Sequence, residues 1–117
     1  MPNSPPHLEH GTKAELLAVR YLEQRGLRLL TQNYRCPFGE IDLVMRDKDV
    51  LVFVEVRLRR NTSFGGAAFS ITEAKRARIS RTAEHYLQRH GNVACRFDVI
   101  LMREVEANTV EWLVNAF

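Results

Sequence analysis

The sequence predicts an α/β fold in which helices pack on a mixed β-sheet. The prediction rests on the hydrophobic periodicity of the segments and on the connections between them. Helical patterns at residues 12–26 and 70–91 enclose three strand-like runs, and further strand-like runs follow the second helix. Short turns join the first three runs and predict an antiparallel meander. A strand, a helix and a strand in succession instead return parallel through a right-handed crossover. The predicted order is α-β-β-β-α-β(-β).

Length and composition fit one globular domain. The chain has 117 residues, of which 45% are hydrophobic and 26% are charged, which argues against collagen-like, coiled-coil and disordered classes. Residues 1–10 are rich in proline, so we expect a mobile tail there and a single domain over residues 11–117. No apolar stretch approaches the roughly 20 residues that span a bilayer, and the start lacks signal-peptide features. We therefore expect a cytoplasmic protein with no membrane partner.

The first helix is predicted from its capping signal and its apolar stripe. Thr12 and Glu15 have the spacing of a capping box, and Gly26 is a natural stop because glycine readily adopts the conformation that ends helices. The residues expected on the buried face are Ala14, Leu17, Ala18, Tyr21 and Leu22.

The next three elements are predicted from alternation and from β-branched residues. Residues 27–32 form a short strand, and residues 33–39 form a turn with proline and glycine. Residues 40–46 alternate, and their core-facing set is Ile41, Leu43 and Met45. Residues 50–56 are almost continuously apolar, which is typical of a central strand covered on both faces.

The second half contains a helix and a terminal hairpin. Residues 70–73 open a helix that runs to about His90 and stops at Gly91. Its core side is expected to carry Ile79, Ala83, Tyr86 and Leu87. Residues 96–103 form a further strand, and residues 110–114 pair with it.

Glu55 interrupts the apolar central strand, where an unpaired carboxylate is costly to bury. If the preceding turn has an even number of residues, Asp47 pairs with Val50. Counting outward then places Asp42 opposite Glu55, with Cβ atoms roughly 5 Å apart. An odd, unbulged loop would place the two carboxylates on opposite faces. Facing carboxylates repel each other unless a proton or a cation lies between them, and Mg²⁺ prefers such oxygen ligands.

Arg57 projects from the same face as Glu55, because the two residues are two positions apart on one strand. Its fixed charge can hold a phosphate or stabilise charge that develops on one. Two acids and a cation around one phosphate favour metal-assisted hydrolysis, with Mg²⁺ or Mn²⁺ as the cofactor.

Basic residues outnumber acidic ones by 17 to 14, which gives a net charge of +3. All but three of them are arginine, whose fork of donors suits phosphate oxygens. Many lie in one stretch that contains a single acid, Glu73: Arg57, Arg59, Arg60, Lys75, Arg76, Arg78 and Arg81. We expect nucleic acid to contact Arg57, Arg59, Arg60, Lys75 and Arg78, and weigh this against a plain solvated surface.

Several motifs together resemble those of a known family. They are Gly39-Glu40-Ile41-Asp42-Leu43-Val44, Phe53-Val54-Glu55-Val56-Arg57, Phe64-Gly65, Lys75 and Arg96-Phe97-Asp98. As a set, and from Gly11 onward, the chain resembles the YraN-like family (uncharacterised protein family 0102), a bacterial family similar to the PD-(D/E)XK nucleases. Those nucleases include archaeal-type Holliday junction resolvases, so the resemblance implies a restriction-endonuclease-like core.

The resemblance implies a role for each matching residue. Asp42 and Glu55 are expected to hold the metal ion with the main-chain carbonyl of Val56 as a third ligand. Glu15 matches the helical acid that resolvase-like enzymes place near the metal. Arg57 stands where the superfamily carries lysine. A desolvated lysine can lose its proton and activate a water, whereas arginine stays charged, so Arg57 can stabilise charge but cannot act as a base.

The three acids also have purely structural interpretations. Glu55 can be a buried acid that is paired with Arg57 or with an arginine of the helix. Asp42 can be a solvated residue near a strand end. Glu15 satisfies a capping box without any metal.

We therefore expect a divalent-metal-dependent nuclease that hydrolyses phosphodiester bonds, with DNA, in particular branched or junction DNA, as the favoured substrate. A two-fold homodimer would offer two sites to a symmetric junction. The alternative is a non-catalytic nucleic-acid-binding module with a degenerate nuclease site, whose binding survives EDTA. A third hypothesis is an adaptor whose basic face docks an acidic protein.

Overall fold

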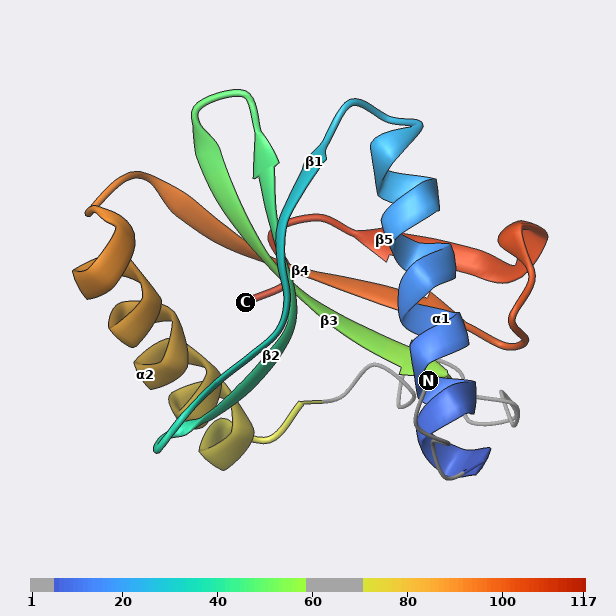
Figure 1. Ribbon diagram of the computed structural model, residues 1–117, viewed down its shortest axis with the longest axis horizontal. Helices are drawn as coiled ribbons and strands as arrows, with labels where there is room; N and C mark the ends of the chain where they lie inside the picture. The colour runs from blue at the N-terminus through green and yellow to red at the C-terminus, as the bar shows by residue number, and fades with distance from the viewer. Residues whose placement is uncertain (1–5, 59–70) are drawn as a thin grey trace, which may run out of the picture.

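The computed structural model describes residues 6–58 and 71–117, which form a five-stranded sheet with two α-helices packed on it (Figure 1). The elements are α1 (Pro6–Glu23), β1 (Arg28–Cys36), β2 (Gly39–Asp47), β3 (Val50–Leu58), α2 (Glu73–His90), β4 (Cys95–Met102), the 3₁₀ turn η2 (Ala107–Thr109) and β5 (Val110–Leu113). This order, α-β-β-β-α-β-β, confirms the predicted α/β fold class. Neither α-helix, over the described part of the chain, is long and apolar enough to cross a membrane.

The strands lie side by side in chain order, β1-β2-β3-β4-β5. The first three form an antiparallel meander, β4 runs parallel to β3, and β5 returns antiparallel to β4. The meander, the parallel crossover and the terminal hairpin are therefore confirmed. The two helices cover opposite faces of this sheet, with α2 at the left and α1 at the right of Figure 1.

Helix α1 begins earlier than the sequence predicts. It starts at Pro6, so the predicted start at Thr12 is wrong, and residues 6–10 belong to the helix rather than to a tail. Residues 1–5 lie outside the described residues. Proline is favoured in the first turn of a helix, because the N–H that it lacks would have no intrahelical partner there.

The end of α1 and its buried stripe agree with the prediction. Gly26 adopts φ 96°, and its N–H bonds to the carbonyl of Glu23. The N–H of Leu27 bonds to the carbonyl of Leu22, which completes a Schellman motif. The buried residues of the helix are Ala14, Ala18, Val19 and Leu22, with Leu17 and Tyr21 packed beside them.

The first hairpin is longer than predicted. β1 continues through residues 33–36, and Cys36 pairs with Gly39, so the turn is only Pro37–Phe38 and not residues 33–39. The polar residues in this stretch hide the strand, because propensity is a weak guide to edge strands.

Asn33 adopts φ 55° within β1, and the two strands of this hairpin exchange faces at that point. Before it, Gln32 pairs with Leu43, which packs on the α1 side. After it, Tyr34 pairs with Ile41, and both pack on the α2 side. A left-handed residue breaks the period-2 alternation of a strand, and asparagine tolerates that conformation. The prediction that Ile41 and Leu43 share a face is therefore wrong.

Two separate apolar cores flank the central strand, as its continuously apolar sequence predicts. The core on the α1 side includes Leu43, Met45, Val52, Val54, Ile100 and Met102 from the sheet. The core on the α2 side includes Ile41, Val44, Leu51 and Phe53 from the sheet and Ile79, Ala83 and Tyr86 from the helix. Glu55 shares strand parity with Leu51 and Phe53, so its side chain belongs to the α2 side.

Helix α2 begins and ends where the sequence predicts. Thr72 is the N-cap, and its hydroxyl accepts a hydrogen bond from the Lys75 N–H at 3.2 Å. Gly91 ends the helix with φ 111°.

Asp98 holds the terminal hairpin from a fully buried position in β4. Arg96 Nε donates to both of its carboxylate oxygens, at 3.1 and 3.3 Å. Trp112 Nε1 donates at 2.9 Å and the Asn115 N–H donates at 2.8 Å. Arg96 also reaches Asp47 at 3.1 Å, which ties this cluster to the β2–β3 hairpin.

Candidate active site

The β2–β3 hairpin has the register on which the predicted carboxylate pair depends. Asp47 pairs with Val50 across a two-residue turn, and the ladder continues in step as far as Leu43. The even-turn alternative is therefore the correct one. Beyond Leu43 the regular pairing stops, at the point where Asp42 would face Glu55.

The Asp42 carboxylate accepts a hydrogen bond that a main-chain carbonyl of β2 would accept if the β2–β3 ladder continued. In the same register Ile41 would pair with Val56, but the Val56 N–H donates instead to Asp42 Oδ2 at 2.8 Å. The N–H and the C=O of one strand residue point to the same side. The Val56 carbonyl is therefore directed to the side of β3 on which Asp42 lies, which is where a third metal ligand would be required.

Glu55 is buried in β3, and two basic side chains contact it. Lys75 Nζ, on α2, lies 2.6 Å from Glu55 Oε2, and Arg57 Nε lies 3.4 Å from the same oxygen. Glu55 is only 9% exposed, so its charge would be costly without such partners. The structure thus places Arg57 beside Glu55 and adds a lysine from the helix.

Asp42 and Glu55 line one pocket of about 200 Å³ between β2, β3 and α2. Its other lining residues are Gly39, Glu40, Lys75, Arg78 and Ile79. Gly39 allows the β1–β2 hairpin to approach α2 closely, since a Cβ atom there would lie 3.2 Å from Thr82 Oγ1. The pocket therefore joins three acids, Glu40 and Asp42 on β2 and Glu55 on β3, to basic residues on the first turns of α2.

The carboxylate of Asp42 has no ion-pair partner among the side chains of residues 12–58 and 71–117. Burial and the negative charge of Glu55 raise the pKa of Asp42 from 3.8 to about 7, although the hydrogen bond from Val56 acts in the opposite direction. Near neutral pH this carboxyl group is therefore partly protonated, and a nearby cation would stabilise its charged form.

A hard divalent cation fits these oxygen donors. Mg²⁺ commonly takes one or two protein carboxylates and leaves its other positions to water and phosphate. Asp42, Glu55 and the Val56 carbonyl would form such a set. In the part of the chain that the structure describes, no three His, Cys, Asp or Glu side chains gather closely enough to hold a metal ion. An ion here would therefore depend on main-chain, water or substrate oxygens as well.

Glu15 lies on α1 and does not line this pocket. Its carboxylate accepts a hydrogen bond from Gln32 Nε2 at 3.3 Å, on the α1 side of the sheet. Its charge still contributes to the raised pKa of Asp42. The structure thus brings Asp42, Glu55 and Arg57 together, with Glu15 nearby but outside the pocket.

Two of the predicted nucleic-acid-binding residues, Lys75 and Arg78, line the pocket from α2. Arg57 lies at its edge beside the buried acid. Arg59 and Arg60 fall outside the described residues.

The contact between Lys75 and Glu55 was not predicted from the sequence. The sequence places Lys75 in the basic stretch and among the family motifs, but it does not show how a helix docks on a sheet. One signal was available: Lys75 is one of only three lysines in an arginine-rich chain.

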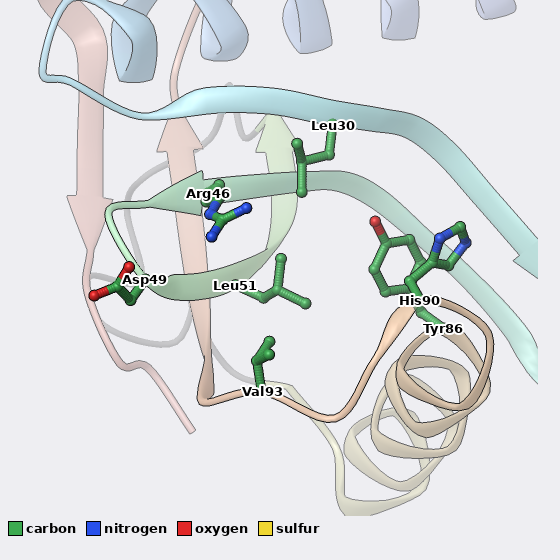
Figure 2. Close-up of a pocket in the computed structure, with 7 residues that line it drawn as sticks. All are labelled: Leu30, Arg46, Asp49, Leu51, Tyr86, His90 and Val93. Carbon is green, nitrogen blue, oxygen red and sulfur yellow. The ribbon is translucent and has the colours of Figure 1, made fainter.

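A second pocket, of about 230 Å³, lies at the opposite end of α2 (Figure 2). Its lining residues are Leu30, Arg46, Asp49, Leu51, Tyr86, His90 and Val93. Tyr86 and His90 stack with ring centroids 4.2 Å apart and form one wall. Arg46 and Asp49 are exposed and carry opposite charges. The acid of this pocket, Asp49, is exposed, so the pocket lacks a half-buried acid of the kind that Asp42 provides, and it is not the candidate active site.

Comparison with known proteins identifies the family. The chain matches the model of "Uncharacterised protein family UPF0102" over residues 14–102. A UPF0102 protein of Methylobacillus flagellatus is 55% identical over 107 residues, which cover 92% of this chain and 95% of that protein. A UPF0102 protein of Nitrosococcus oceani is 52% identical over 115 residues, which cover 95% and 93% of the two chains. These matches confirm the resemblance drawn from the motifs, and the chain belongs to the uncharacterised protein family UPF0102.

Proposed function

We propose that this protein is a divalent-metal-dependent nuclease that hydrolyses phosphodiester bonds of nucleic acid. One observation carries the proposal: Asp42 and Glu55 line the same pocket, where burial and Glu55 raise the pKa of Asp42 to about 7. A carboxylate pair of this kind favours a bound cation. The basic residues on the pocket wall favour a polyanionic substrate.

Each residue of the pocket has a role in this proposal. Asp42 and Glu55, with the Val56 carbonyl, would hold Mg²⁺ or Mn²⁺. The ion would supply Lewis-acid stabilisation of charge on the phosphoryl group. Arg57 and Arg78 would contact phosphate oxygens, because arginine offers paired donors to them.

Three further residues would assist from outside the pocket. Glu15 would act through its charge, which already influences Asp42. Arg59 and Arg60 follow Arg57 closely in the sequence, and we propose that they contact the same nucleic-acid backbone.

DNA, and branched DNA in particular, is the substrate that the family resemblance favours. A domain of 117 residues covers little nucleic acid, whereas a two-fold homodimer would present two pockets to a symmetric junction. Sedimentation that showed only monomers, with and without junction DNA, would contradict this part of the proposal.

A non-catalytic nucleic-acid-binding module is the second candidate, and one observation favours it. Arg57 stands at the position of the superfamily lysine, and it lies against Glu55 together with Lys75. In that case the basic residues would bind phosphate, and the acids would only position them. Binding would then persist in EDTA and would change little in Asp42→Asn.

Cleavage of labelled linear, flapped and four-way DNA, and of RNA, with Mg²⁺ or Mn²⁺ separates the two candidates. We expect Asp42→Asn and Glu55→Gln each to lower the cleavage rate at least about 100-fold. Asp49→Asn and Glu111→Gln make the same changes at exposed positions and should retain activity. If no substrate is cut while wild type and variants bind alike, the protein is a binding module and the nuclease proposal is wrong.

A further inference from the structure

The first turn of α2 places a lysine directly at the candidate metal site. Lys75 Nζ lies 2.6 Å from Glu55 Oε2, closer than Arg57 Nε at 3.4 Å. Lys75 also lines the pocket that contains Asp42. Its side chain is 35% exposed, so the ammonium group remains accessible to a ligand that enters the pocket.

The backbone of Lys75 is held firmly, although its side chain is long. Its N–H donates to the hydroxyl of the N-cap Thr72, and the Arg76 N–H bonds to the Thr72 carbonyl at 2.9 Å. One turn further along α2, Ile79 is buried in the core. These contacts fix the first turn of α2 against the sheet, so the base of the Lys75 side chain has a defined position.

Lysine and arginine behave differently beside a carboxylate. The Nε atom of Arg57 is buried and makes no hydrogen bond to the described residues, and its guanidinium is a rigid, planar fork. Lysine is a compact point charge with three donors on a flexible stem. Lys75 can therefore leave Glu55 when a divalent ion takes its place, and can then contact an adjacent phosphate oxygen.

We infer that Lys75, supplied by α2, is the lysine of this active site: its ammonium group neutralises Glu55 in the metal-free protein and contacts the scissile phosphate when a divalent ion binds. The phosphate contact rests on the proposed nuclease function. The competition at Glu55 does not, because an ammonium group beside a carboxylate opposes the binding of any second cation there. Removal of the charge should therefore strengthen metal binding whether or not the chain cuts nucleic acid.

Calorimetric titration with Mn²⁺ tests the competition. We expect Lys75→Met and Lys75→Gln to bind Mn²⁺ about 3- to 10-fold more tightly than wild type. Two charge-removing variants are used so that the result does not depend on the folding of one protein. Lys13→Met is the matched control, because Lys13 is exposed on α1, and it should leave the affinity unchanged. Equal or weaker Mn²⁺ binding by both Lys75 variants would overturn the inference.

Cleavage at saturating Mn²⁺ tests the phosphate contact. Lys75→Met should cut about 100-fold more slowly than wild type, although it binds the metal more tightly. An ion pair that merely docked α2 would instead change thermal stability and leave Mn²⁺ affinity as in wild type.

The two proposals fail in different ways. If wild type cuts and Lys75→Met cuts equally fast, the inference is wrong and the nuclease proposal stands. If wild type cuts nothing but Lys75→Met still binds Mn²⁺ more tightly, the nuclease proposal and the phosphate contact are wrong, and only the competition at Glu55 is supported. If wild type binds no Mn²⁺ and cuts nothing, both proposals are wrong.

Discussion

Asp98 and Asp42 are aspartates of the same sheet, but Asp98 is fully buried and Asp42 only partly, and their surroundings differ. The side chain of Asp98 is fully buried, and its donors are Arg96, Trp112 and Asn115. Within the described part of the chain, Asp42 accepts one hydrogen bond, from the Val56 N–H, and it lies close enough to Glu55 for the negative charge to raise its pKa. One carboxylate is thus satisfied by the protein, and the other is not.

This difference separates a structural acid from a functional one. Buried polar groups are normally hydrogen-bonded, so an under-satisfied carboxylate in a pocket is a candidate for ligand binding. The carboxylate oxygens of Asp98 accept hydrogen bonds that join β4 to β5 and to Asn115. Asp42 has acceptor capacity left for a cation. Residue type alone would not distinguish the two, whereas their donors do.

Removal of the Asp98 carboxylate should have the largest effect on the free energy of unfolding. Asp98→Ala leaves the donors on Arg96 and Trp112 without their buried acceptor, so we expect the free energy of unfolding to fall by about 3–5 kcal/mol. Urea denaturation followed by circular dichroism measures this change. A loss below about 1 kcal/mol would show that the terminal hairpin does not depend on Asp98.

Asp42, which accepts fewer hydrogen bonds than Asp98, should make the free energy of unfolding depend on pH. The pKa of Asp42 is raised from 3.8 to about 7, so the fold favours the protonated carboxyl. Its contribution to stability is fully present below pH 3.8 and is lost as the pH rises through 7, by about 4 kcal/mol in all without metal. Urea denaturation in EDTA at pH 4 to 8 should show this fall in wild type relative to Asp42→Asn. Parallel curves for the two proteins would contradict the prediction.

A divalent ion bound by the Asp42 carboxylate should stabilise the fold, as the hydrogen-bond donors around Asp98 do. At a Mn²⁺ concentration about 30 times the dissociation constant, we expect the free energy of unfolding to rise by about 2 kcal/mol. Asp42→Asn should lose most of this gain, and the exposed control Asp49→Asn should keep it. Thermal unfolding with and without Mn²⁺ provides the measurement, and an equal gain in Asp42→Asn would place the ion elsewhere.

The smallest change removes one donor from Asp98. Trp112→Phe retains the ring packing but loses the Nε1 hydrogen bond at 2.9 Å, which should lower the free energy of unfolding by about 1 kcal/mol. Its stability should remain well above that of Asp98→Ala, because Arg96 and Asn115 still donate. Equal destabilisation by the two variants would mean that Trp112 carries the whole cluster.

Local signals in the sequence were sufficient for much of the fold and for part of the candidate site. The start of the second helix within residues 70–73 and the Gly26 stop are each set by neighbouring residues, and both are confirmed. Of the two turn lengths considered before Val50, the structure has the even one. The pairing of Asp42 with Glu55 followed from that turn, because register propagates along an antiparallel ladder. Both acids line one pocket, although regular pairing stops one residue before Asp42.

The remaining features depend on packing that a sequence pattern does not show. Leu43 and Ile41 pack on opposite faces, and the break lies opposite the left-handed Asn33 of β1, which alternation alone cannot indicate. The contact of Lys75 with Glu55 requires α2 to dock on the sheet. The start of α1 at Pro6 differs from the predicted tail because the first turn of a helix accepts proline, although proline disfavours a helix elsewhere.

The parallel pairing of β3 with β4 has a consequence for the order of folding. Asp42 and Glu55 meet across a tight hairpin, whereas Lys75 lies on the long crossover that must close before β4 can join the sheet. Closure of a long loop precedes any gain from such distant contacts, which makes them slow to form. We therefore expect Asp42 and Glu55 to come together early during synthesis and Lys75 to join them late. Until α2 docks, the nascent chain presents two adjacent acids without their lysine.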